Sequence, residues 1–438
     1  MRRPVRGPAN RASTRSGGSR TVTARHAHAL AIWALGLTQI VGYGTLYYSF
    51  AILAPAMAAE FRWPEQWVFG ALSAALLAGG LLAPTAGRLA DRFGAGRVMT
   101  VGSFAAALAL LACGLAPERA TFVLALVSME LASCFVLYST AFVAIVQLGG
   151  RNAQRSITHL TLIAGFASTL FWPLTATLHQ HLAWREVYVV FAGFNLLLCL
   201  PIHAWIAALS RRSGATEDTA LPSALPPRPM LSDPRNRSRA FLLLLAGFAA
   251  EGFVLSAILV HMVPLTSALG LGAAGLFIAS LFGPAQVASR LINMVFGGRL
   301  AQTWLAVIAA ALPASGVLVL IATTPWLPGA VAFAILFGLG SGLTSIVGGT
   351  LPLELFGRER YGARLGWIAA ARQLTSALAP FALALMMAST TISTSLWVLV
   401  TTGAAGLVAF FMIAMVQRHA LQMRHDPECI GEAELGTT

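Results

Sequence analysis

Four ionisable residues lie inside long apolar segments of the sequence. Placing a charged group at the centre of a bilayer costs at least about 2.5 kcal/mol on insertion scales, so such a group usually faces a partner, a ligand or a polar pathway. There an arginine can bind a carboxylate through two parallel hydrogen bonds, and a buried carboxyl group can take up a proton. The four residues are Glu130, Glu251, Arg290 and Arg372.

Uncharged polar residues accompany these charges at helical spacing. Gln39, Tyr43 and Tyr47 share one face of the first apolar segment, and Gln286 lies one turn before Arg290. Residues three or four apart lie on the same face of a helix. The pattern predicts a polar site between helices, with ordinary packing between helices as the alternative.

Composition requires that these segments lie in a membrane. The chain has 438 residues, of which 57% are hydrophobic and only 10% are charged, whereas soluble domains carry roughly a quarter charged residues. The net charge is +13, but the arginines are scattered through short loops, which argues against nucleic-acid binding. We find no metal-ligand cluster, nucleophile motif or phosphate loop, so we predict neither an enzyme nor a bound metal or cofactor.

A charged turn separates the second and third apolar segments, over residues 87–97. Its glycines permit a sharp turn, and Asp91 can offer a carboxylate to the positive N-terminus of the following helix. The turn resembles the signature loop of the major facilitator superfamily, which implies a gating role for the matching residues. The matches are Gly87, Asp91, Arg92, Gly94 and Arg97; Gly96 stands where the family usually has a basic residue.

Part of this turn recurs half a chain later. Residues 298–301 repeat residues 87–90 after another apolar segment, as expected of a transporter built from two parallel halves. The second copy has Gln302 where the first has Asp91, so we predict that gating depends mainly on the first half. The resemblance implies an all-α membrane protein with twelve transmembrane helices in two pseudo-symmetric six-helix bundles.

The arginines predict the orientation of the chain. Predicted inner segments hold 24 arginines and predicted outer loops hold three, so we expect both termini in the cytoplasm of a bacterial cell and the helices in its inner membrane. We expect a disordered tail over residues 1–28, a six-helix bundle over 29–209, a cytoplasmic linker over 210–238, a second bundle over 239–417 and a cytoplasmic tail over 418–438.

The resemblance also places all four buried charges on helices that line or flank a central cavity. Arg290, in the eighth span, resembles the substrate arginine of the monocarboxylate porters and the oxalate/formate exchangers. The aspartate that usually precedes it by four residues is Gln286 here, and the chain has no lysine, so the proton coupling of the porters cannot be transferred. Any coupling would depend on Glu130 or Glu251.

These observations predict a monomeric secondary transporter that moves a small organic anion by alternating access, with proton symport or exchange. Two alternatives remain open: an efflux pump whose Glu130 or Glu251 attracts a cation, and a purely structural ion pair of Arg290 with one of these glutamates. The predicted substrate-binding residues are Arg290, Arg372, Tyr43, Tyr47, Gln39 and Gln286, and the predicted proton-coupling residues are Glu130 and Glu251.

Overall fold

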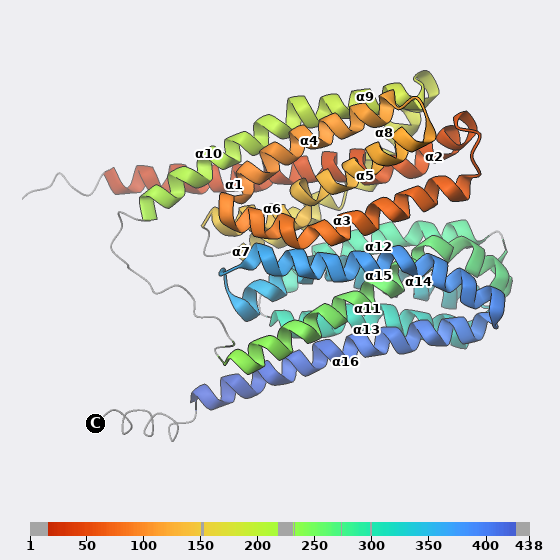
Figure 1. The fold of residues 1–438 in the computed structure, drawn as a ribbon. Helices are drawn as coiled ribbons and strands as arrows, with labels where there is room; N and C mark the ends of the chain where they lie inside the picture. Colours follow the sequence, from red (N-terminus) through yellow and green to blue (C-terminus); the bar gives the residue numbers. More distant parts are fainter. Residues whose placement is uncertain are drawn as a thin grey trace, which may run out of the picture.

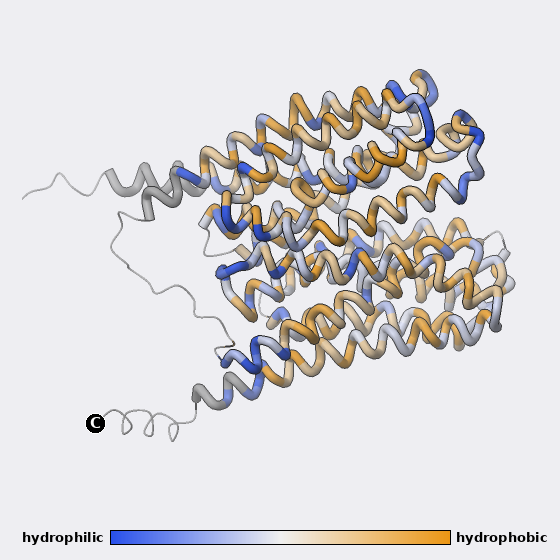
Figure 2. The backbone as a smooth tube through the Cα atoms, viewed as in Figure 1, coloured by the Kyte–Doolittle hydropathy of each residue, from blue (hydrophilic) through white to orange (hydrophobic). Residues whose placement is uncertain are grey.

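Twelve helices long and apolar enough to cross a membrane make up the described part of the computed structural model, which covers residues 16–149, 153–217, 231, 233–272, 274–297 and 300–425. The helices form two bundles that lie side by side, one from each half of the chain (Figure 1). Hydrophobic residues cover the length of the helices, and hydrophilic residues gather at the two ends (Figure 2). The predicted all-α membrane fold is confirmed.

The elements of the first bundle are α1 (Ser16–Tyr43), η1 (Gly44–Tyr48), α2 (Ser49–Glu60), α3 (Glu65–Phe93), α4 (Ala95–Leu115), α5 (Arg119–Val136), α6 (Tyr138–Gln147), α7 (Ala153–Ala164), α8 (Ala167–His181), α9 (Trp184–Phe194), η2 (Asn195–Cys199) and α10 (Leu200–Glu217). Those of the second bundle are α11 (Pro234–Thr266), η3 (Ser267–Leu271), α12 (Ala274–Phe296), α13 (Gln302–Thr323), α14 (Leu327–Phe356), α15 (Tyr361–Ser389) and α16 (Ile392–His425). The segments labelled η are single turns of π-helix.

Several helices extend beyond the predicted apolar segments. Helix α1 begins at Ser16, within the predicted tail 1–28, and α10 and α11 extend into the predicted linker 210–238. Residues 298 and 299 of the repeated turn lie outside the described residues. The start of α1 and the end of α16 lie at the same end of the molecule (Figure 1), which we call the terminal end. It is the end for which the sequence predicts a cytoplasmic location.

The signature turn is shorter than expected, because its first seven residues are helical. Helix α3 continues through Phe93, and Gly94 alone, with φ 89°, connects it to α4. A positive φ favours glycine, which has no Cβ to clash with the backbone. Asp91 therefore projects from the last turn of α3 rather than from a loop.

Asp91 binds a helix of the other bundle, not the following helix as predicted. Its two carboxylate oxygens accept hydrogen bonds from the backbone N–H groups of Gly362 and Ala363, both at 2.8 Å, in the first turn of α15. The first N–H groups of a helix have no partner within it and carry partial positive charge, so a carboxylate there is stabilising. The N-terminus of α4 is bound by Gln147 instead, through Ala95 N at 2.7 Å.

Glycines bring α3 and α15 into backbone contact beside Asp91. A Cβ atom on Gly87 would lie 2.0 Å from the carbonyl oxygen of Gly362, and one on Gly366 would lie 2.4 Å from that of Ala83. Small residues at helix interfaces permit such close approach in membranes, where packing drives association. The two bundles are therefore in direct contact along this helix pair.

A second carboxylate at the terminal end also reaches across the bundles. Glu354, on α14, accepts a hydrogen bond from Gln154 of α7 at 3.4 Å and caps α13 through Gln302 N at 3.2 Å. The second half therefore also contributes a carboxylate at this end, and the prediction that gating depends mainly on the first half stays a prediction. Gln302 lacks the charge of Asp91, but Glu354 supplies one from a neighbouring helix.

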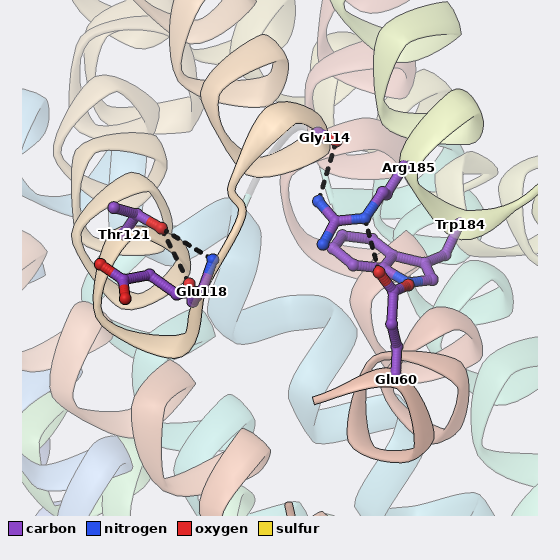
Figure 3. Close-up of polar contacts among 6 residues, drawn as sticks. All are labelled: Glu60, Gly114, Glu118, Thr121, Trp184 and Arg185. Carbon is purple, nitrogen blue, oxygen red and sulfur yellow. Dashed lines mark hydrogen bonds and ion pairs between the residues drawn. The ribbon is translucent and has the colours of Figure 1, made fainter. Parts of the chain in front are cut away.

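The opposite end is held together within the first bundle (Figure 3). Glu60 accepts a hydrogen bond from the indole N–H of Trp184 and pairs with Arg185 at 2.8 Å, and Arg185 also donates to the carbonyl oxygen of Gly114 at 3.1 Å. Thr121 and Glu118 cap the start of α5. Among the described residues, the hydrogen bonds between bundles lie between the terminal end and the middle of the helices. The terminal end is thus closed in this structure.

Replacing Gly87 by alanine should destabilise the protein, because the added Cβ would clash with the carbonyl of Gly362. Overpacking of this kind costs about 1–3 kcal/mol. Gly70→Ala is the matched control on the same helix, since a Cβ there would have no neighbour within 4 Å. Thermal unfolding of both variants in detergent should show a lowered Tm for Gly87→Ala alone. Equal Tm values would contradict the contact.

Asp91→Asn should favour opening of the terminal end, because asparagine keeps one acceptor but loses the charge that faces α15. A charge at a helix N-terminus contributes about 0.3–2 kcal/mol, so the open fraction should rise roughly 2- to 30-fold. The reporter is alkylation of Val143→Cys, placed in a protein without its native cysteines, because Val143 is buried beside Asp91 and lines a cavity of about 200 Å³. Glu65→Gln, at the other end of α3, is the control, and an alkylation rate unaffected by Asp91→Asn would contradict the role.

Candidate functional site

Four spans of the first bundle are interrupted near their middles. The first and sixth contain the π-helical turns η1 and η2, the fourth breaks at Leu137 between α5 and α6, and the fifth breaks after Ala164 between α7 and α8. An interruption leaves backbone carbonyls without helical partners, and the bilayer core offers no water to bind them. Side chains of neighbouring helices must therefore supply the hydrogen bonds.

The break in the fourth span is held by Gln39. Its amide group donates to the carbonyl of Val136 at 2.7 Å, and Thr140 donates to that of Cys134 at 2.9 Å. Gln39 is fully buried, and in this structure its amide group stabilises the break through that hydrogen bond. The π-helical turn η1 is held similarly, by Asn195 of η2, which donates to Thr45 at 2.9 Å.

Five aromatic residues gather at these interruptions. Tyr43 lies 4.7 Å from Tyr138 between ring centroids, Tyr47 lies 5.3 Å from Tyr48, and Tyr48 lies 6.3 Å from Trp172. Tyr138 begins α6 directly after the break, and Trp172 lies one turn into α8. Tyr47 and Trp172 are 47% and 50% exposed, so the cluster has accessible ring surface.

Arg290 connects the second bundle to the break in the fifth span. Its Nη1 donates to the carbonyl of Thr161 at 3.0 Å, and its Nε donates to Ser345 of α14 at 3.1 Å. Gly165 leaves room for this guanidinium, because a Cβ atom at that position would lie 2.3 Å from Nη1. Arg290 is only 4% exposed. It therefore occupies the interface between the bundles.

Arg372 has a different environment. It is exposed, and its guanidinium makes no hydrogen bond or ion pair with another described residue. Its side-chain stem lies against Gly252 of α11, where an added Cβ would be 2.8 Å from Cγ. The charges of both arginines act on the phenol groups of Tyr48 and Tyr138. Arginines of one bundle thus lie in the neighbourhood of tyrosines of the other.

We call these residues the tyrosine–arginine site. Its members are Tyr43, Tyr47, Tyr48, Tyr138, Trp172, Arg290 and Arg372.

The two buried glutamates have no ion-pair partner within the described residues. Glu130 is 3% exposed, with Ser133 donating to one oxygen at 3.3 Å and no partner for the other. Glu251 is 5% exposed, its Oε1 also has no partner, and the charge of Arg372 acts on it. The structural alternative, an ion pair of Arg290 with Glu130 or Glu251, is not formed.

The structure thus separates the residues predicted from sequence. It places Tyr43 and Tyr47 near Arg372, and Arg290 near Tyr48 and Tyr138, whereas Gln39 supports the backbone break. Gln286 donates to Ser341 of α14 at 2.9 Å, within its own bundle. Sequence reasoning missed Tyr48, Tyr138 and Trp172 as members of the site. Aromatic residues beside a helix break were the available signal, but the breaks themselves are fixed by distant residues.

Comparison with known proteins agrees with this architecture. A family model described as Major Facilitator Superfamily matches residues 35–380. No curated protein matches the chain. Similar solved structures include the human organic anion transporter MFSD10 (TETRAN), with 15% identity and a TM-score of 0.68 over 88% of this chain and 99% of that one.

Two further structures are similar at 12% identity and a TM-score of 0.63. One is the transporter FucP in the outward conformation, with 88% of this chain and 99% of that chain covered. The other is the proton:xylose symporter XylE bound to 6-bromo-6-deoxy-D-glucose, with coverage of 87% and 95%. At such identities the likeness shows the fold alone. The family match covers most of the chain, and this protein is a multi-pass membrane transporter that belongs to the major facilitator superfamily.

Proposed function

We propose that this transporter moves a small organic anion by alternating access, with the anion bound at the tyrosine–arginine site. The observation that carries the proposal is Arg372, an exposed guanidinium between the bundles that has no partner among the described residues. A guanidinium presents two parallel N–H groups that match a carboxylate. One structural neighbour is an organic anion transporter, but the proposal rests on the side chains.

Arg290 takes a second role in this proposal. It already donates to Thr161 in the other bundle, so an anion that approaches it competes with a backbone carbonyl for the same guanidinium. Binding could then weaken a contact that holds the bundles together, while the anion itself bridges them. Substrate occupancy would thereby be linked to the rearrangement that transport requires.

Proton coupling is assigned in this proposal to Glu251 first and Glu130 second. Glu251 directly precedes Gly252, against which the side-chain stem of Arg372 lies, and it has an unpartnered oxygen. A substrate carboxylate at Arg372 would offset the positive charge that otherwise favours ionised Glu251, so the glutamate would bind a proton more readily. Anion and proton would then move together.

We further propose that the protein acts as a monomer in a bacterial inner membrane, with both termini in the cytoplasm. The arginine-rich terminal end supports this orientation. The rival function is efflux of a cation attracted by Glu130 or Glu251. It would require the glutamates, and not the arginines, to determine binding.

Arg372→Ala should abolish carboxylate-driven transport in liposomes that contain a pH-sensitive dye. Losing a charged hydrogen-bond partner costs about 2–3 kcal/mol, or roughly a 30- to 150-fold loss of affinity. Arg290→Ala should also impair transport. Arg235→Ala, an exposed residue at the start of α11, is the control for charge and folding. Because weak acids cross bare lipid, only differences between proteins count. A response to lipophilic cations that survives Arg372→Ala would favour efflux.

Glu251→Gln should separate anion movement from proton movement, because glutamine resembles the protonated carboxyl group but cannot release a proton. The variant should still exchange labelled for unlabelled carboxylate across the membrane, while the internal dye no longer reports a pH change. The same assay on Glu130→Gln compares the second carboxyl group. Coupling that persists in Glu251→Gln but disappears in Glu130→Gln would move the proton site to the first bundle.

A further inference from the structure

We infer that the substrate of the tyrosine–arginine site is a monocarboxylate that carries an aromatic ring. The inference rests on the proposed function and adds a substrate class to it. It follows from three features of the site: the accessible aromatic surface, the number of available cations and the division of both between the bundles.

The first feature is the aromatic surface. Tyr47 and Trp172 are each about half exposed, and each is in contact with Tyr48, at 5.3 Å and 6.3 Å between ring centroids. In a site built only for a two- or three-carbon acid, this surface would have no apolar group to contact. Aromatic rings prefer edge-to-face or offset contacts with other rings, so the exposed rings of Tyr47 and Trp172 would favour contact with a planar ring.

The phenol hydroxyls add polar contacts around that surface. The hydroxyl groups of Tyr48 and Tyr138 make no hydrogen bond to another described residue, and neither is among the fully buried atoms that lack a partner. They are therefore accessible to a ligand. Hydroxyl groups can donate to a carboxylate that is already bound to an arginine.

The second feature is the number of available cations. Arg290 is 4% exposed and donates to two protein acceptors, whereas Arg372 is exposed and unpaired within the described residues. One guanidinium is thus free to bind a carboxylate without first losing protein hydrogen bonds. This count favours an acid with one carboxylate over one with two.

The third feature is how these groups are divided. The free cation belongs to α15 of the second bundle, and the aromatic surface belongs to η1 and α8 of the first. A ligand that satisfies both must present a carboxylate on one side and a ring on the other. Such a ligand would contact both bundles at once, as alternating access requires of a substrate that drives closure.

The test compares ligand-induced thermal stabilisation of the purified full-length protein by four acids. Benzoate and cyclohexanecarboxylate have the same charge and similar size, but only benzoate is planar and aromatic. Acetate lacks a ring, and oxalate carries a second carboxylate. The dependence of Tm on ligand concentration gives an apparent Kd for each acid. We expect benzoate to bind roughly 2- to 12-fold more tightly than cyclohexanecarboxylate, the range of an aromatic pair contact.

Substitutions locate this preference in the structure. Tyr47→Leu and Trp172→Leu should each reduce the preference for benzoate, and Tyr47→Phe, which keeps the ring, should restore it. Arg372→Ala should weaken binding of every acid. Trp67→Leu is the matched control, because Trp67 is 63% exposed at the start of α3, away from the site.

Three results would overturn the inference. Equal binding of benzoate and cyclohexanecarboxylate would show an apolar pocket without aromatic selectivity, and tighter binding of oxalate would show that both arginines bind substrate together. A benzoate preference unchanged in Tyr47→Leu and Trp172→Leu would place the ring elsewhere. In each case the anion function itself would survive. Failure of all four acids to stabilise the wild-type protein would instead contradict the proposed function.

Discussion

The site depends on one constraint, which is that backbone carbonyls inside a bilayer need hydrogen-bond donors from the protein. Where the fourth span breaks, that donor comes from another helix, because Gln39 binds the carbonyl of Val136. Beside the break in the fifth span, the carbonyl of Thr161 accepts from Gly165 N at 3.0 Å and also from Arg290 of the other bundle. The breaks then decide which residues meet. Tyr138 and Trp172 follow them, and Tyr47 and Tyr48 lie in the π-helical turn of the first span. In this protein the aromatic surface is a consequence of interrupted helices.

The same constraint gives the two arginines different properties. Arg290 is stable in its buried position because a backbone break and Ser345 accept its hydrogen bonds, so it holds the bundles together. Arg372 extends from a continuous helix, has no such acceptor in the described part of the chain and stays exposed. In the sequence, Arg290, and not Arg372, resembles a known substrate arginine. In the structure Arg290 already donates to protein acceptors, whereas the guanidinium of Arg372 does not bond to any other described residue.

This contrast shows how far the sequence alone could lead. The apolar segments, the buried charges and the charged turn follow from hydropathy and charge, which are local properties, and the twelve spans and the gating role of Asp91 were implied by the family resemblance of that turn. The breaks follow from neither. Gln39 caps a carbonyl 97 residues away, and Gly165 matters because of a guanidinium from the other half of the chain. For Asp91 the prediction was partly right. The sequence predicts that its carboxylate binds a helix N-terminus, and in the structure it does so, but at α15 rather than at α4. The N-terminus of α4 has Gln147 as its partner.

The terminal end shows how two related halves can share a function unequally. In both halves the first N–H of a helix donates to a side chain 52 residues later, Ala95 to Gln147 and Gln302 to Glu354. In the first half this acceptor is the neutral Gln147, and the carboxylate at this end is Asp91. In the second half the acceptor is the carboxylate of Glu354, and the residue that corresponds to Asp91 is the neutral Gln302. Each half therefore keeps one carboxylate, and each carboxylate also bonds to the opposite bundle, Asp91 to α15 and Glu354 to Gln154. In this structure, hydrogen bonds from a carboxylate of each half therefore join the two bundles at the terminal end, even though only one half retains the signature aspartate.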